Sequence, residues 1–225
     1  MGSFFTNQES SSQRKPGSFY TLAEEIANAI THGIGALLAI AGGIVLIIGA
    51  AYTRDAWRIV SGSVYVGTLF LLFLMSTLYH ALVPEKAKHV FRIFDHTMIY
   101  LLIAGSYTPI TLVALNGAVG WTIFGIVWAI AIVGVVLTSV NLEKFKKFGM
   151  ICYIAMGWCV VFAIIPMIRA LETAGLILFF GGGVFYTGGL WFYSRKNLKY
   201  AHAIWHLFVL AGAILHYFAI LKYIL

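Results

Sequence analysis

Seven long apolar runs, separated by short charged or Pro- and Asn-containing breaks, constrain the fold of this chain most strongly. They extend over residues 24–51, 57–83, 91–115, 119–140, 148–168, 174–193 and 200–225. Each run is long enough to cross about 30 Å of hydrocarbon as a tilted helix. Irregular backbone in lipid leaves amide and carbonyl groups without partners, so the runs predict helices. The predicted fold class is therefore an all-α integral membrane protein, a seven-helix transmembrane bundle in the cell membrane.

The composition excludes a soluble globular protein and a disordered chain. Of the 225 residues, 61% are hydrophobic and only 10% are charged, whereas soluble domains carry about 25% charged residues. We expect a polar cytoplasmic tail over residues 1–22 and a transmembrane domain over residues 23–225. The tail lacks the apolar stretch of a cleavable signal, so the first span is expected to direct insertion. The basic residues are scattered between apolar runs, which argues against a nucleic-acid partner.

The distribution of the 15 Lys and Arg residues predicts the orientation of the chain. Eleven fall in the tail and in alternate loops: Arg14, Lys15, Lys86, Lys88, Arg92, Lys144, Lys146, Lys147, Arg195, Lys196 and Lys199. The four on the opposite side are Arg54, Arg58, Arg169 and Lys222. Because basic residues accumulate in cytoplasmic loops, the N-terminus is predicted in the cytoplasm and the C-terminus outside.

Small residues in the spans have a structural interpretation. The glycines that would permit close helix approach are Gly181, Gly182, Gly183, Gly188 and Gly189. Cys152 and Cys159 are seven positions apart in one apolar run, which on a helix is about 10 Å of rise and too far for a disulfide. We interpret both cysteines as packing residues.

Polar side chains inside the spans are few, and ionisable groups at membrane depth usually mark functional sites. Two pairs have the four-residue spacing that places side chains on one face of a helix. Under the predicted orientation, the polar residues lie toward the cytoplasmic side. They are Glu25, Asn28 and His32 in the first span, Ser76 and His80 in the second, Asp95 in the third, and His202 and His206 in the seventh.

Three of these residues, His80, His202 and His206, predict a zinc site. Three imidazoles leave the fourth tetrahedral position for water, as in catalytic zinc sites. Such water has a pKa of about 7, and the metal can polarise a carbonyl, so the arrangement suits hydrolysis. Asp95 would hold the water or act as general base. Ser76 would donate to an oxyanion or orient Asp95.

Structural interpretations of the same residues stay open. Asp95 can pair with Arg92 or cap the third helix, and the set of serine and histidines can be structural polarity. Periodicity alone does not show that the second, third and seventh helices touch. We interpret His216 as a hydrogen-bonded packing residue and His89 as a solvated residue among basic neighbours.

Two cofactors other than zinc fit the residues less well. A haem between His80 and one histidine of the seventh span would leave the third histidine and Asp95 without a role. A retinal Schiff base needs a lysine in the middle of the membrane, but the seventh span has lysines only at its ends, Lys199 and Lys222.

Several motifs, in order along nearly the whole chain, resemble those of the hemolysin III family. That family belongs to the superfamily of progestin and adipoQ receptors, which is grouped with the alkaline ceramidases. The matching segments are EIANAITHG over residues 25–33, STLYH over 76–80, FDH over 94–96, GSYTP over 105–109 and HAIWH over 202–206.

The resemblance implies a seven-helix fold with a cytoplasmic N-terminus, opposite to that of G-protein-coupled receptors. This agrees with the orientation predicted from the basic residues. It also implies a zinc ion held by His80, His202 and His206, with Asp95 interacting through water and Ser76 nearby.

The leading hypothesis for function is a zinc-dependent hydrolase of a lipid amide or ester that enters from the bilayer. A membrane lipid is then the partner, as substrate or ligand. The first alternative is a non-enzymatic sensor or regulator of lipid state in which zinc is structural. The second is a lytic pore or transporter. The ionisable residues argue against it, because they lie near one side of the membrane and leave no continuous polar path across it. The sequence predicts no particular lipid and no oligomeric state.

Overall fold

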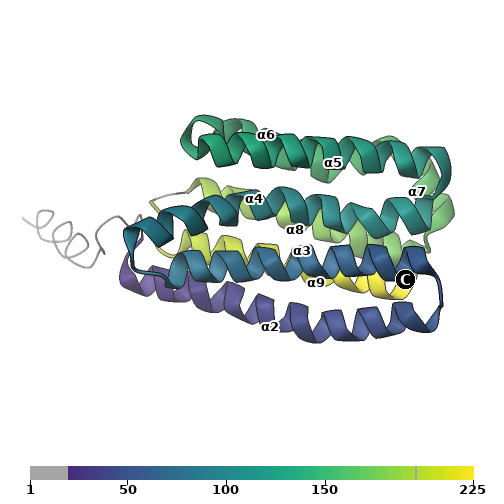
Figure 1. The fold of residues 1–225 in the computed structure, drawn as a ribbon, viewed down its shortest axis with the longest axis horizontal. Coiled ribbons are helices and arrows are strands. Elements are labelled where there is room, and N and C mark those ends of the chain that lie inside the picture. Colours follow the sequence, from purple (N-terminus) through teal and green to yellow (C-terminus); the bar gives the residue numbers. More distant parts are fainter. Residues whose placement is uncertain (1–19, 196) are drawn as a thin grey trace, which may run out of the picture.

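The computed structural model describes residues 20–195 and 197–225. In this part of the chain, seven helical stretches are long and apolar enough to cross a membrane, which confirms the predicted fold class of a multi-pass membrane protein. They run side by side along the long axis of the molecule (Figure 1). The helices are α2 (Leu22–Tyr52), α3 (Ala56–Ala81), α4 (Glu85–Pro109), α5 (Gly117–Val140), α6 (Leu142–Trp158), α7 (Ile164–Ala170), α8 (Thr173–Ser194) and α9 (Ala201–Tyr223).

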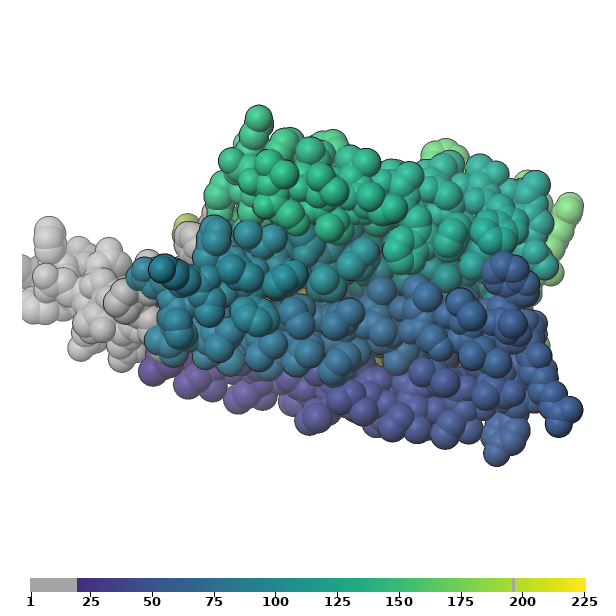
Figure 2. Space-filling view, viewed as in Figure 1, coloured from purple at the N-terminus to yellow at the C-terminus, as the bar shows by residue number. Residues whose placement is uncertain are grey.

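The packing order of the helices brings the first and last described spans together. α2 packs between α3 and α9, α4 packs between α3 and α5, and α8 packs against α9. Figure 1 shows α5 and α6 at the edge of the bundle opposite to α2, and Figure 2 shows successive segments as bands across one face. Large apolar side chains of α2, such as Ile30, Leu37 and Ile44, are exposed and suited to contact lipid.

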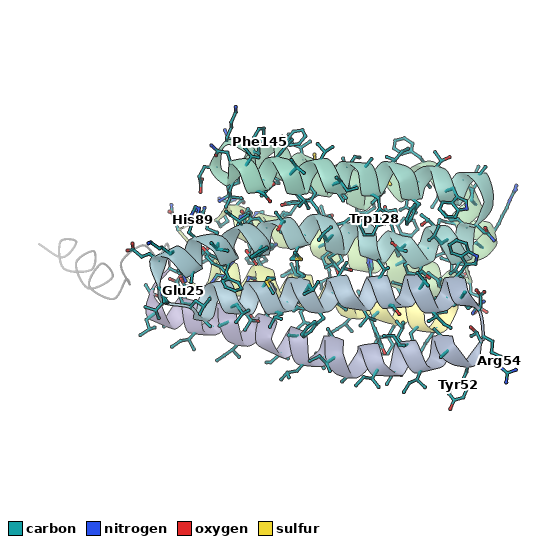
Figure 3. All side chains as sticks on the ribbon, viewed as in Figure 1. Glu25, Tyr52, Arg54, His89, Trp128 and Phe145 are labelled. Carbon is teal, nitrogen blue, oxygen red and sulfur yellow. The ribbon has the colours of Figure 1, made fainter. Side chains whose placement is uncertain are left out.

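The two ends of the bundle carry different segments. Glu25, His89 and Phe145 lie toward one end, and Tyr52 and Arg54 lie at the other (Figure 3). The alternating helix directions thus gather the described basic loops at the end that contains Glu25, which supports the predicted grouping of charge. Which end faces the cytoplasm stays a prediction. The polar tail predicted for residues 1–22 lies mostly outside the described residues.

Two of the spans begin about six residues earlier in the sequence than predicted. The third begins at Glu85 and not at residue 91, because Pro84 precedes a charged helical turn that continues beyond the apolar stretch. Asp95 therefore lies well inside α4, and the interpretation of Asp95 as a helix cap is wrong. The fifth begins at Leu142, where the Asn141 side chain accepts a hydrogen bond from Lys144 N at 2.9 Å.

The fifth span is interrupted where α6 and α7 are joined by a 3₁₀ segment, Cys159–Ala163. Tyr107 of α4 satisfies the backbone there, since its hydroxyl donates to Gly157 O at 2.9 Å and accepts from Val160 N at 3.1 Å. Irregular backbone at membrane depth needs such partners. The two cysteines are free, as predicted.

The contact between α8 and α9 depends on two of the predicted glycines. A Cβ atom at Gly182 would lie 2.7 Å from His216 Nε2 and 3.0 Å from Gly212 O, and one at Gly189 would lie 2.8 Å from Phe208 Cβ. Close approach is therefore confirmed at these two positions. Gly181, Gly183 and Gly188 have ordinary van der Waals surroundings.

Candidate metal centre

Three histidines from two helices converge at the end of the bundle that contains Glu25. His80 belongs to the last turn of α3, and His202 and His206 belong to the first turns of α9. One ring nitrogen of each lies within 4.8 Å of the others. The Nε2 atoms of all three rings are buried and have no hydrogen-bond partner among the described residues. Such a cluster of unpaired imidazole nitrogens can hold a metal ion.

The opposite nitrogens of two of these rings have partners on α2. His80 Nδ1 donates to Glu25 Oε2 at 2.6 Å. His206 Nδ1 lies 3.2 Å from Asn28 O and 3.1 Å from Thr31 Oγ1, both of which can accept. A proton on Nδ1 leaves the lone pair on Nε2, and such outer hydrogen bonds are typical of zinc-ligating histidines. The residues present therefore fit a zinc ion.

Glu25 forms an ion pair with Lys88, which the sequence pattern predicts only as a loop charge. Lys88 Nζ lies 2.8 Å from Glu25 Oε1 and donates to Tyr79 O at 3.0 Å. Both charged side chains are buried, with exposed side-chain fractions of 11% for Lys88 and 2% for Glu25. A buried carboxylate keeps its charge only with such partners. Lys88, Glu25 and His80 thus connect α4, α2 and α3.

The rest of the predicted polar stripe on α2 also faces the histidines. Asn28 Nδ2 lies 3.4 Å from His80 Nδ1. The ring of His32 stacks on that of His206, with centroids 3.4 Å apart and an interplanar angle of 11°. The edge of His32 meets Phe73 at a centroid distance of 5.0 Å. Neither nitrogen of His32 has a hydrogen-bond partner among the described residues.

Tyr20, which precedes α2, covers the histidines from the end of the bundle. Its ring centroid lies 4.8 Å from that of His202 and 5.7 Å from that of His80. Burial raises the pKa of the Tyr20 phenol, and the nearby carboxylates of Asp95 and Glu25 raise it further, so the hydroxyl stays protonated. Tyr20 adjoins the polar tail and follows no helical spacing, so no sequence pattern predicts its place beside the histidines.

The beginnings of α2 and α9 are tied together by a second glutamate. Thr21 is the N-cap of α2, and Glu24 completes its capping box: Glu24 Oε2 accepts from Thr21 N at 2.9 Å while Thr21 Oγ1 accepts from Glu24 N. Its other oxygen, Oε1, accepts from Tyr200 N at 3.1 Å. Tyr200 has a φ of 60°, which bends the chain into α9 just before His202. The capping box of one helix therefore also positions the helix that carries two of the histidines.

The two predicted catalytic residues lie in different surroundings. Asp95 is 5% exposed, and its Oδ2 lies 3.5 Å from His96 Nδ1. Arg92, the pairing partner considered from the sequence, forms an ion pair with Glu143 of α6 at 2.5 Å. Ser76 is fully buried, and its hydroxyl has no hydrogen-bond partner among the described residues.

A mainly apolar cavity of about 150 Å³ begins beside the histidines and continues between α4, α6, α8 and α9. At the polar end it is lined by His32, Asp95, His96, Lys146 and His202. Ser76, His80 and His206 are not among its lining residues. The apolar walls include Ile99, Leu102, Tyr153, Leu190, Trp205 and Val209.

The two remaining predicted histidines are separate from the cluster. His216 lines the far part of the cavity, and its Nε2 donates to Phe179 O at 2.9 Å, which confirms a hydrogen-bonded role between α9 and α8. His89 is exposed near the beginning of α4, as predicted for a solvated residue.

Comparisons with known proteins agree with the resemblance seen in the motifs. The profile of the haemolysin-III-related family matches residues 20–217. The chain is 46% identical to Hemolysin-3 of Bacillus cereus, over 90% of this chain and 92% of that protein. It is 44% identical to the Hemolysin-3 homolog of Bacillus subtilis (strain 168), over 91% and 96%. It is 31% identical to the human Monocyte to macrophage differentiation factor, over 91% and 86%.

Proposed function

The chain belongs to the haemolysin-III-related family of membrane proteins, and from this premise we propose that it is a zinc-dependent hydrolase of lipid amide or ester bonds. The observation that carries the proposal is the convergence of three unpartnered imidazole nitrogens, one of which belongs to His202, a residue that lines an apolar cavity. His80, His202 and His206 would hold the zinc ion. When bound, zinc would polarise a carbonyl group and make water more acidic.

Asp95 is the acid–base residue in this proposal. Its carboxylate lines the cavity beside His202, where it can accept a proton from the attacking water. The same proton then passes to the departing amine or alcohol as the bond to the carbonyl carbon breaks. Ser76, one helical turn before His80, has a buried hydroxyl without a hydrogen-bond partner among the described residues, and in this proposal the hydroxyl would donate to the oxyanion.

The apolar part of the cavity would hold the lipid chain. Its walls come from α4, α6, α8 and α9, and their surroundings in the membrane are lipid. In this proposal the substrate enters the cavity from the bilayer, and its chain stays among apolar side chains. Pockets that bury most of a ligand against apolar walls and offer a few polar groups are the usual form of small-molecule sites.

Metal analysis of the purified protein tests the proposal first. We expect about one zinc per chain in the wild type and none in His202→Ala/His206→Ala. His89→Ala, which removes an exposed histidine, serves as the matched control and should keep its zinc. A wild-type protein without zinc, or a double variant that retains it, overturns the metal assignment.

Turnover of lipids by the zinc-loaded protein tests the catalytic half. We expect hydrolysis of at least one lipid amide or ester by the wild type, and at least about a hundredfold loss in Asp95→Asn, as for removal of an acid–base group. The variant must retain its zinc for the comparison to count. Hydrolysis that is unchanged in a folded, zinc-loaded Asp95→Asn protein contradicts the role of Asp95.

A non-enzymatic lipid sensor with structural zinc is the second candidate function. One observation favours it: His80 and His206 do not line the cavity, and closed coordination is typical of structural zinc. Under this alternative, Ser76→Ala and Asp95→Asn would retain both the metal and the cellular phenotype. Loss of the phenotype in folded, zinc-loaded variants supports the hydrolase instead.

The relatives named Hemolysin-3 raise a third candidate, a lytic pore. The interior of the bundle at the end away from the histidines argues against a pore. The large side chains of Leu46, Tyr65 and Ile220 are buried there. Ion flux through liposomes that persists when the protein is diluted would revive this candidate.

A further inference from the structure

His32 lies beside the cluster of His80, His202 and His206, but it has no role in the proposed metal site or in the proposed reaction. It is 2% exposed, and both ring nitrogens lack hydrogen-bond partners among the described residues. A buried polar group without partners is unfavourable, and such groups in a native protein call for an explanation. His216 shows the ordinary solution, since one of its nitrogens donates to a backbone carbonyl.

The packing of His32 fixes the plane of its ring. The ring lies almost parallel to His206, at a centroid distance of 3.4 Å, and Phe73 meets its edge at 78°. Because the two imidazoles are stacked, the nitrogens of His32 occupy a separate layer. The group of nitrogens that can share one ion contains His80, His202 and His206 but not His32. A role as a fourth ligand therefore does not fit.

The position of His32 relative to the cavity indicates a different role. His32 is a lining residue at the polar end, together with Asp95 and His202. An uncharged imidazole offers one N–H donor and one acceptor nitrogen. Asp95 supplies only acceptor oxygens when ionised. His32 adds a hydrogen-bond donor to this end of the cavity, where His96 and Lys146 are further lining residues with N–H groups.

We propose that His32 binds the carbonyl oxygen of the ligand in the cavity, by donating a hydrogen bond from one ring nitrogen. The ligand class is a long-chain compound with a carboxyl, ester or amide group, whose chain occupies the apolar walls. His32 is then a substrate-contacting residue. The inference rests on the proposed function for the kind of ligand, but binding can be measured without any turnover.

Phenylalanine at position 32 separates this role from simple packing. Its ring preserves the stack on His206 and the edge contact with Phe73, while both nitrogens are removed. Glutamine keeps a side-chain donor but not the ring. Trp205→Phe is the matched control, because Trp205 lies beside His32 at a centroid distance of 6.5 Å and also lines the cavity.

The experiment measures the binding of myristic acid and of tetradecane to the purified, zinc-loaded protein in phosphatidylcholine nanodiscs. We expect His32→Phe to weaken the binding of myristic acid about tenfold, as for one hydrogen bond to a charged group. Tetradecane binding, zinc content and the thermal unfolding midpoint should stay at wild-type values. His32→Gln should recover part of the affinity, and Trp205→Phe should affect both probes alike.

Three results would overturn the inference. One is equal affinity of wild type and His32→Phe for myristic acid; another is a parallel loss for both probes, which indicates packing. The third is loss of zinc from both His32→Phe and His32→Gln, which would make His32 part of the metal centre. Selective loss of myristic acid binding without any lipid turnover would support His32 as a binding residue and count against the hydrolase alone.

Discussion

Glu25 and His80 are 55 positions apart in the sequence, yet a 2.6 Å hydrogen bond joins the carboxylate of one to the imidazole of the other. The bond fixes the His80 proton on Nδ1 and aims Nε2 toward the other two histidines. It also makes the position of His80 in the candidate metal site depend on the contact between α2 and α3. The affinity for a zinc ion at this site should therefore depend on Glu25, although Glu25 would not contact the ion.

Replacement of Glu25 by glutamine should lower zinc affinity about 10- to 100-fold, the usual effect of changing the outer hydrogen-bond partner of a ligating histidine. The amide cannot supply the negative charge that strengthens His80 as a ligand. Competition with a chromophoric chelator measures the affinity. Glu172→Gln, an exposed position at the other end of the bundle, is the control. Equal zinc affinities of Glu25→Gln and the wild type would show that Glu25 does not influence the metal site.

Lys88→Met should destabilise the fold by about 3 kcal/mol, because it leaves the buried charge of Glu25 without its cationic partner. Thermal or denaturant unfolding in detergent measures the change. Lys86→Met, which removes an exposed lysine two positions earlier, should have little effect. The double variant Glu25→Gln/Lys88→Met should recover part of the loss. If the two single effects simply add, the ion pair is not an energetic unit.

Gly35→Ala should destabilise the protein by about 1–3 kcal/mol, as for overpacking of a core. The added Cβ would lie 2.6 Å from Phe73 Cδ1, and Phe73 supports the edge of His32. Gly49 has open space around it, so Gly49→Ala is the matched control and should be neutral or slightly stabilising. Unfolding midpoints of the two variants give the comparison. Equal midpoints would show that Phe73 moves aside at no cost.

Tyr20→Ala should accelerate the removal of zinc by a chelator, while the zinc content before chelation stays at the wild-type level. The Tyr20 ring covers His80 and His202, so its loss opens a path to the metal from the end of the bundle. Tyr20→Phe keeps the ring and should behave like the wild type. Stopped-flow measurement of zinc release distinguishes the three proteins. Equal release rates would mean that the metal leaves by another route, such as the cavity.

Much of the bundle can be predicted because the membrane restricts the backbone to helices, and apolar runs mark their positions. The predicted boundaries of the spans are wrong mainly where a helix extends into charged sequence, as at Glu85. The His202 and His206 pair is visible because both residues share one helix face. Lys88 and Tyr20 are not predictable in this way, because their contacts cross between segments and no spacing along one helix reports them.

The placement of the histidine cluster has a consequence for how the protein is made. The partners on α2, Glu25 and Asn28, are synthesised early, whereas His202 and His206 arrive only with α9. During synthesis, the ion-binding group cannot exist until α9 has been inserted and has docked beside α2. If the histidines bind a metal, its capture would report that all seven spans have been inserted, and a chain truncated before residue 202 would be unable to retain the ion.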